Sequence, residues 1–156
     1  MAQPLAMVVD DSPIVLKFAT TIVEKLGYRV CTASDGLQAL ALLKDARCKL
    51  VLTDYEMPTV NGYQLAKKIK SQLPSIRVVI MTGLCQNQVI ELMNDQDIDG
   101  WLFKPFGLEE LKAILWQLGL YDNTGPADSV PLRSPKSNGL RAREKIKSHF
   151  RRSDLG

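Results

Sequence analysis

Five short runs of apolar and β-branched residues recur along the chain, with longer mixed stretches between them. The runs lie at residues 6–9, 28–33, 49–53, 77–82 and 100–104. Each run is nearly continuous in apolar character, whereas a strand with one face in water would alternate apolar and polar positions. The pattern therefore predicts short strands that are buried on both faces of a parallel sheet.

The stretches between these runs have helical periodicity. Ser12 and Pro13 offer an N-cap and a first-turn proline to the first helix, and Gly27 offers its end. The apolar face of this helix consists of Val15, Phe18, Ile22 and Leu26. Further helices are predicted over residues 36–47, 65–73, 86–94 and 108–118. The 86–94 stretch is the most polar of these, so its helical pattern is the weakest.

Strand and helix alternate in this way from residue 6 to residue 118. Such an order is typical of α/β proteins, in which right-handed crossover helices cover both faces of a parallel sheet. We therefore predict a flavodoxin-like doubly wound (βα)5 fold. It is a three-layer sandwich whose parallel strands follow the order 2-1-3-4-5.

The pattern ends near Tyr121, where a stretch rich in Pro, Ser and Gly begins. Residues 1–120 hold 12 Lys and Arg and 13 Asp and Glu (net −1), whereas residues 121–156 hold 8 and 4 (net +4). This change predicts a single domain over 1–120 and a basic, largely disordered tail over 121–156. The tail has no motif of a DNA-binding domain. A solvated extension is its plainest interpretation, and contact with nucleic acid or acidic lipid is the alternative.

Composition excludes several classes of function. The single histidine, His149, lies in the tail, so residues 1–120 offer no imidazole base, nucleophile or metal ligand. The three cysteines have no metal-ligand spacing, and we expect reduced thiols that serve in packing. No apolar run is long enough to span a membrane, and the N-terminus does not resemble a signal peptide, so we expect a cytoplasmic protein.

Polar side chains follow most of the predicted strands. They are Asp10 and Asp11, Asp54, Thr82, and Lys104 next to Pro105. In a doubly wound sheet, ligands bind outside the carboxyl ends of the strands, where the strand order reverses. The predicted order places these strand ends side by side, so the polar residues should converge. Met57-Pro58 and Asn61-Gly62, which come after Asp54, fit turn formation.

The residue types at these strand ends suit phosphoryl transfer. Carboxylates that lie together repel each other unless a cation sits among them, and oxygen ligands without His or Cys favour Mg²⁺, with Mn²⁺ as a substitute. Lys104 and Thr82 add a positive charge and a hydroxyl donor. Asp54 would be the nucleophile that becomes an aspartyl phosphate. Each residue alone could equally be a cap or a solvated side chain; their shared edge of the sheet favours the joint function.

These motifs resemble the receiver domains of two-component response regulators. The matching stretches, in order across residues 5–120, are VVDDSP, LTDYEMPTVNG, VIMTG and GWLFKPF. The resemblance implies that Asp54 accepts the phosphoryl group, that Asp11 binds Mg²⁺ directly and that Asp10 acts mainly through water. It also implies that the backbone carbonyl of Glu56 completes the metal ligands.

The same resemblance gives roles to residues of the last two strands. Thr82 and Lys104 would contact the phosphoryl group, and a cis peptide is expected between Lys104 and Pro105. Trp101 matches the aromatic switch position, where the family usually has Tyr or Phe. The protein would then be a stand-alone receiver that catalyses its own phosphorylation and slow dephosphorylation, not a metabolic enzyme.

The resemblance also implies partners. The phosphoryl donor would be a phosphohistidine on a sensor histidine kinase or on a His-containing phosphotransfer protein, which supplies the imidazole missing from residues 1–120. The signal would pass to a downstream target protein through the surface of segments 86–94, 100–104 and 108–118. The protein would be a terminal effector or, alternatively, a phosphorelay intermediate.

Two alternatives from other classes stay open. A scaffold with the same fold would work without phosphorylation, although the complete set of polar strand ends favours an active site. A phosphohydrolase of the haloacid dehalogenase superfamily also uses an aspartyl nucleophile, but that nucleophile ends the first strand in an Asp-x-Asp motif. Here Asp54 ends the third predicted strand, and residues 1–120 leave no room for a cap domain.

Overall fold

The computed structural model describes residues 3–44 and 47–121. The strands are β1 (Leu5–Val9), β2 (Arg29–Ala33), β3 (Cys48–Asp54), β4 (Arg77–Thr82) and β5 (Gly100–Phe103). The helices are α1 (Pro13–Lys25), α2 (Gly36–Leu43), α3 (Gly62–Gln72), α4 (Gln86–Val89), the 3₁₀ helix η1 (Leu92–Asn94) and α5 (Leu108–Gln117). The chain divides into two compact units after Leu111, within α5. The first unit holds the sheet and all polar strand ends predicted above.

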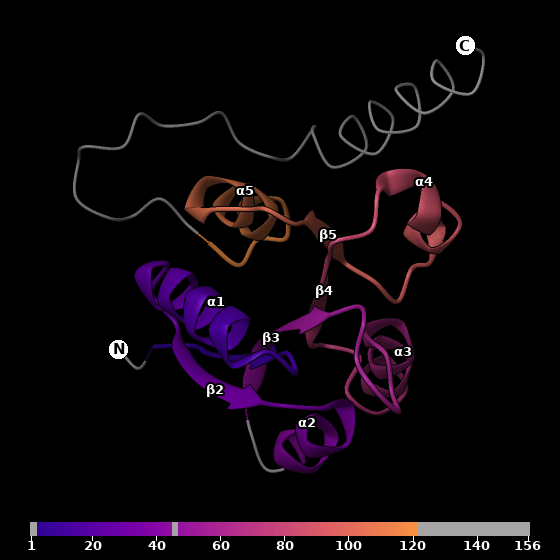
Figure 1. Cartoon of the computed structure of the whole chain (residues 1–156). Helices are drawn as coiled ribbons and strands as arrows, with labels where there is room; N and C mark the ends of the chain where they lie inside the picture. Colours follow the sequence, from indigo (N-terminus) through magenta and orange to yellow (C-terminus); the bar gives the residue numbers. More distant parts are fainter. Residues whose placement is uncertain (1–2, 45–46, 122–156) are drawn as a thin grey trace. The chain divides into compact units, whose positions relative to one another are not determined.

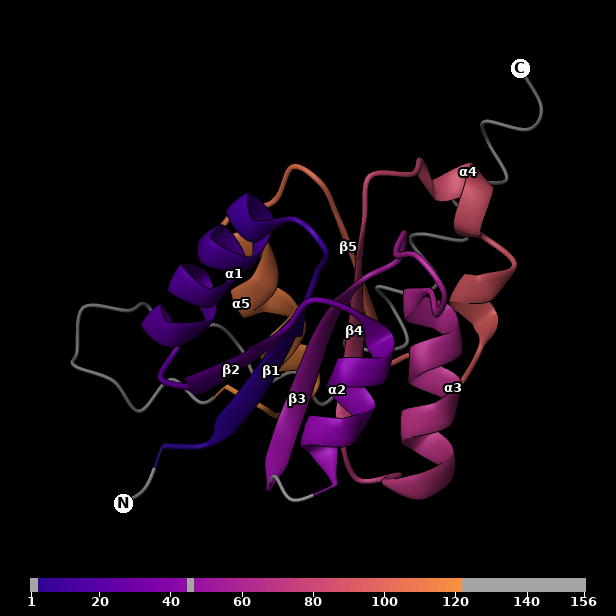
Figure 2. The same cartoon turned by 60° about the horizontal axis from the view of Figure 1, so that its bottom comes forward.

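The strands form one parallel sheet in the order β2-β1-β3-β4-β5, which confirms the predicted fold. Helix α1 lies on one face of this sheet, and α2 and α3 lie side by side on the other (Figures 1 and 2). The chain therefore changes faces between α1 and α2. At this change of face the sheet continues from β1 to β3, so these two strands are neighbours. Their carboxyl ends therefore lie at the same edge of the sheet.

The core explains why the strand sequences are almost continuously apolar. Between the sheet and helices α2 and α3, the buried side chains include Met7, Val9, Ala39, Leu43, Val51, Leu65, Ala66, Ile69, Val78 and Ile80. Alternate strand residues such as Val8, Leu52 and Met81 are equally buried and point to the face that carries α1. Both faces of the central strands are thus in the core, so the strands position the residues that follow them rigidly.

The start of α1 agrees with the predicted capping signals, whereas the start of α3 was not predicted. The Ser12 hydroxyl accepts a hydrogen bond from the Val15 amide, which caps α1, and Pro13 is the first helical residue. Asn61 caps α3 in a reciprocal capping box with Gln64. The prediction that Asn61 and Gly62 form a turn was therefore wrong, because both belong to the start of this helix.

Two predicted helices are shorter in the structure. The helix predicted over 36–47 ends at Leu43. The helix predicted over 86–94 is divided into α4 and η1, of four and three residues. Val89 is the only buried residue between 83 and 97, so too little apolar surface is buried there to support a continuous helix.

The cysteines are free thiols, as predicted, but they do not all serve in packing. Cys48 is buried, and burial raises the pKa of its thiol to about 11, which keeps it protonated and unreactive. Cys85 is exposed at the N-cap of α4, so the expectation of a packing role was wrong for this residue.

The second unit is described over residues 112–121, which complete α5 and the turn after it. Gly119 has a φ of 71°, the left-handed conformation that favours glycine, and it ends the helix. Across the described residues, no helix has the length and apolar character needed to cross a membrane. The predicted boundary between residues 120 and 121 stays a prediction, and the basic tail lies outside the described residues.

Candidate functional site

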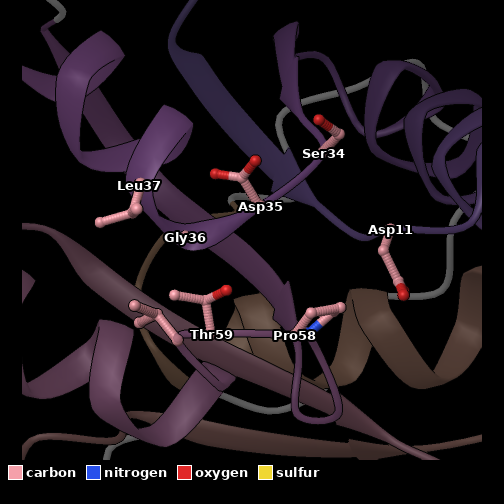
Figure 3. Close-up of a pocket in the computed structure, with 8 residues that line it drawn as sticks. Asp11, Ser34, Asp35, Gly36, Leu37, Pro58 and Thr59 are labelled. Carbon is pink, nitrogen blue, oxygen red and sulfur yellow. The ribbon is translucent and has the colours of Figure 1, made fainter.

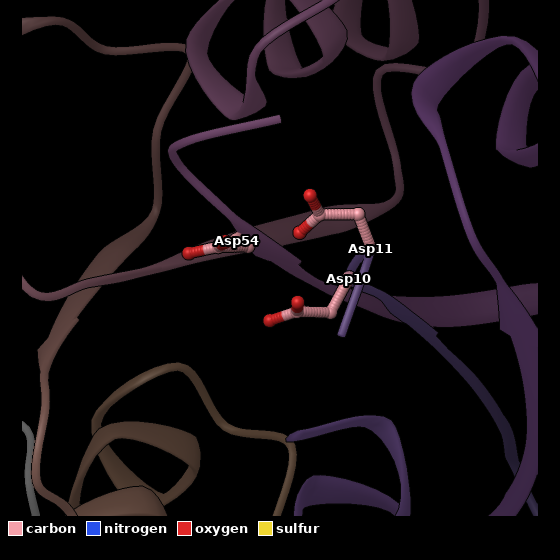
Figure 4. A group of neighbouring side chains, drawn as sticks. All are labelled: Asp10, Asp11 and Asp54. Carbon is pink, nitrogen blue, oxygen red and sulfur yellow. The ribbon is translucent and has the colours of Figure 1, made fainter. Parts of the chain in front are cut away.

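Three carboxylates meet at the carboxyl edge of the sheet. Asp10 and Asp11 directly follow β1, and Asp54 is the last residue of β3. Because these strands are neighbours, one oxygen from each carboxylate lies within 4.8 Å of the others (Figure 4). Asp10 and Asp54 are buried, whereas Asp11 is exposed. The predicted acidic cluster is therefore present, with one side open to a ligand.

Lys104 brings a positive charge to this cluster from β5. Its Nζ lies 3.1 Å from Asp54 Oδ1 and 3.7 Å from Asp10 Oδ2. The Lys104 amide donates to the Thr82 carbonyl, which fixes the backbone of the lysine against the end of β4. The peptide bond between Lys104 and Pro105 is cis, as the sequence predicted.

The cluster has more negative charge than its partners balance. Burial raises the pKa of Asp10 and of Asp54; the Ser12 amide opposes the shift at Asp10, and Lys104 opposes it at Asp54. Asp10 Oδ2 is buried and has no hydrogen-bond partner in the described part of the chain. Among the described residues, Lys104 is the one cation paired with these carboxylates, so the site is chemically suited to an additional cation with a preference for oxygen ligands.

Asp10→Asn is expected to stabilise the metal-free protein by about 1 kcal/mol, since it removes a buried charge with one unsatisfied oxygen. Folding raises the pKa of Asp10 above 3.8, so this carboxyl group stabilises the fold below that pH and destabilises it as the pH rises. The gain should be present at neutral pH and shrink toward pH 3.8. Urea unfolding in EDTA at several pH values measures it.

The exposed neighbour provides the control for this prediction. Asp11→Asn changes the same type of side chain one position away, where solvent already screens the charge. Its effect on the free energy of unfolding should be smaller than that of Asp10→Asn. If Asp10→Asn instead lowered the free energy of unfolding, the idea that the cluster has an excess of negative charge would be contradicted. The Asp10 carboxylate would then stabilise the fold.

Thr82 ends β4 and Trp101 lies in β5, and the two side chains have different kinds of contacts. Thr82 is fully buried, and its Oγ1 accepts a hydrogen bond of 3.0 Å from the Leu84 amide. Trp101 is half-buried in β5, with its ring centroid 6.1 Å from that of Tyr55. Its Nε1 is buried and has no hydrogen-bond partner among the described residues. Movement of the Thr82 side chain would therefore break its hydrogen bond with the Leu84 amide, and movement of Trp101 would change its packing against Tyr55.

The loop after Asp54 is held by backbone contacts that sequence reasoning missed. The Tyr55 amide donates to the Met81 carbonyl (2.8 Å), and the Tyr55 carbonyl accepts from the Gly62 amide (2.9 Å). A Cβ on Gly62 would collide with the Asp54 carbonyl and lie 3.0 Å from Tyr55 Cα. The glycine thus lets α3 begin directly against the residue that ends β3. The exposed Glu56 lies within this loop.

A shallow cavity of about 240 Å³ adjoins the cluster through Asp11 (Figure 3). Its other lining residues come from the β2–α2 and β3–α3 connections: Ser34, Asp35, Gly36, Leu37, Pro58, Thr59 and Val60. Asp54 and Lys104 do not line it. The cavity therefore lies beside the acidic cluster, and the Asp54 side chain does not open into it.

The fold and the site together define a doubly wound α/β domain with an acidic cluster and a lysine at the carboxyl edge of its sheet. The family model of the response regulator receiver domain matches residues 6–115. The chain therefore belongs to the receiver domain family of response regulators, the domains of phosphorylation-dependent two-component signalling.

Similar proteins include Protein PilG and a sensor histidine kinase. Protein PilG of Pseudomonas aeruginosa is 36% identical over 110 residues, which cover 67% of this chain and 79% of PilG. The sensor histidine kinase RcsC of Salmonella typhi is 32% identical over 111 residues, 71% of this chain but only 12% of RcsC. The chain thus spans a small part of that relative.

A solved structure with the same fold contains a metal. The receiver domain of the sensor histidine kinase PA1611 from Pseudomonas aeruginosa is 27% identical, with a TM-score of 0.66 over 74% of this chain and 97% of that one. That domain has a magnesium ion coordinated in its active site cleft.

Proposed function

We propose that Asp54 accepts a phosphoryl group from a phosphohistidine of a sensor kinase or a His-containing phosphotransfer protein. The observation that carries the proposal is the Asp54 carboxylate, buried at a strand end, 3.1 Å from Lys104 and beside two further carboxylates. An Asp54 oxygen forms a bond to phosphorus while the phosphorus–nitrogen bond of the donor breaks. The bond's electron pair leaves with the imidazole.

Residues Asp10, Asp11 and Asp54, with the backbone carbonyl of Glu56, would hold Mg²⁺, and Mn²⁺ would serve as a substitute. The Asp10 oxygen that lacks a hydrogen bond and the purely oxygen donor set fit such an ion. When bound, the ion supplies positive charge that offsets the charge of the phosphoryl oxygens.

Lys104 and Thr82 respond to the new group in different ways. The phosphoryl group adds roughly −1.5 to −2 charges, so Lys104 exchanges its contact with Asp54 for contact with phosphoryl oxygens. The Thr82 hydroxyl donates to the phosphoryl group, which draws it away from the Leu84 amide. Trp101 then repacks, and the changed surface of α4 and β5 binds a downstream protein. Hydrolysis of the acyl phosphate by water resets the switch slowly.

The test is phosphorylation by a small donor. Incubation with acetyl phosphate and Mg²⁺ should add the mass of one phosphoryl group, as measured by intact-protein mass spectrometry. The adduct should be absent with EDTA, should form with Mn²⁺ and should disappear after mild alkali, which cleaves acyl phosphates. The proposal would be overturned if the folded chain formed no adduct with acetyl phosphate and also accepted no phosphoryl group from a phosphohistidine protein.

A further inference from the structure

Residues 84–94, referred to here as the α4 segment, are weakly held between their two ends. Val89 is the only buried side chain in the segment. Its helices have four and three residues, and the hydrogen bonds of their caps, such as Gln88 to Cys85, are local. Few buried contacts and short helices are the properties of a region that opens more readily than the core.

The start of the α4 segment depends on one side chain of the candidate site. The Leu84 amide donates to Thr82 Oγ1 at 3.0 Å, and Thr82 itself is fixed at the buried end of β4. Gly83, between them, is exposed. A change at the Thr82 hydroxyl therefore directly affects the first hydrogen bond of the segment.

The end of the α4 segment has a different kind of attachment, to helix α3. Asp95 Oδ2 accepts a hydrogen bond from the Tyr63 hydroxyl (2.6 Å) and pairs with Lys67 Nζ at 2.6 Å. Its other oxygen accepts from the Asp97 amide at 2.9 Å. Lys67, with Tyr63 assisting, lowers the pKa of Asp95 to about 2. The carboxylate is charged and fully bonded throughout the physiological pH range.

The attachment continues along the chain to the start of β5. Lys67 also pairs with Asp97 at 3.0 Å, and Lys70 pairs with Asp99 at 2.6 Å. Asp99 in turn accepts from the Val78 amide of β4. Lys67 and Lys70 lie one turn apart on α3, so residues 95–99 are fastened along that helix.

We propose that Asp95, held by Tyr63 and Lys67, is a fixed pivot that confines the backbone motion of switching to the α4 segment, while Trp101 in β5 changes only its side-chain packing. When the Thr82 hydroxyl moves, the start of the segment is released, while its end stays attached to α3. The motion then stops at Asp95 and leaves the hydrogen bonds of β5 in register. The claim about switching rests on the proposed function, whereas the attachment of Asp95 to α3 does not depend on it.

Hydrogen–deuterium exchange of the unphosphorylated protein tests the attachment. Tyr63→Phe removes one charge-assisted hydrogen bond but keeps the ring, so amide exchange in residues 85–98 should rise on the order of tenfold. Lys68→Ala, at an exposed position of the same helix, is the matched control and should leave this exchange unchanged. Equal exchange in the two variants would overturn the pivot.

The phosphorylated protein tests the confinement. In the wild-type chain, the adduct should change exchange within residues 84–94 and leave 95–99 as before; in Tyr63→Phe, the change should extend into 95–99. A wild-type change that passes Asp95 would overturn the pivot. If acetyl phosphate and a phosphohistidine donor both fail to give an adduct, the proposed function fails, and the unphosphorylated comparison still decides the attachment.

Discussion

The Asp54→Asn variant is expected to lose the phosphoryl adduct completely after treatment with acetyl phosphate and Mg²⁺. The amide nitrogen and oxygen of Asn are far weaker nucleophiles than a carboxylate, while the side chain keeps its size. Lys104 retains Asp10 as a partner at 3.7 Å, so this half-buried cation keeps an ion pair. Intact mass after timed incubation measures the loss directly, and a thermal unfolding curve shows that the variant is folded.

Asp35→Asn is the control for this variant. Asp35 lines the cavity beside Asp11 and caps α2, a position at which Asn serves equally well. This variant should acquire the adduct at the wild-type rate. An adduct that persists in Asp54→Asn and maps to Asp10 or Asp11 would move the acceptor to another residue of the cluster and contradict the assignment.

Gly62→Ala should destabilise the fold by about 3 kcal/mol and impair phosphorylation at the same time. An added Cβ would collide with the backbone carbonyl of Asp54, where neither partner is a flexible side chain. The higher helix propensity of Ala returns only about 1 kcal/mol, so the collision dominates. Displacement of the Asp54 backbone would also move the acceptor carboxylate relative to Lys104. Urea unfolding and the rate of adduct formation measure the two effects.

Gly83→Ala separates this collision from a general effect of replacing glycine. Gly83 is exposed after β4, and an added Cβ there would meet nothing within 4 Å. Its free energy of unfolding should change by less than about 0.5 kcal/mol. A Gly62→Ala variant as stable as Gly83→Ala would show that α3 can shift away from β3 without cost, against the close fit of these two elements.

The sequence contained enough information for the fold and the acidic cluster. The central strands β1, β3 and β4 are buried on both faces, so their apolar runs are nearly continuous and easy to recognise. The alternation of five strands with helices favours the observed strand order. The cluster follows from that order, because Asp10 comes directly after β1 and Asp54 ends the neighbouring strand β3. The strands can be predicted from residues close together in the sequence. The cluster can be predicted once the topology shows which strand ends are neighbours.

The features that the sequence did not reveal depend on contacts between distant residues. Tyr63 and Asp95 are 32 residues apart, and nothing in the local pattern pairs them. The Asn61-Gly62 pair is compatible with both a turn and a helix start; the capping partner Gln64, three residues later, was the signal available for the correct choice. The division of the 86–94 helix follows from how little of it the tertiary structure buries, and its polar composition already weakened that prediction.

The sparse burial of the α4 segment has an evolutionary consequence. All of its residues except Val89 are exposed or half-buried, so substitutions there cost less folding free energy than substitutions in the core. The acidic cluster, in contrast, is set by buried strands that tolerate little change. Under the proposed function, selection could therefore alter which protein binds to this segment without disturbing the phosphorylation chemistry at Asp54. The same separation would let an engineer exchange residues 86–94 to redirect the output while Asp54 and its neighbours stay untouched.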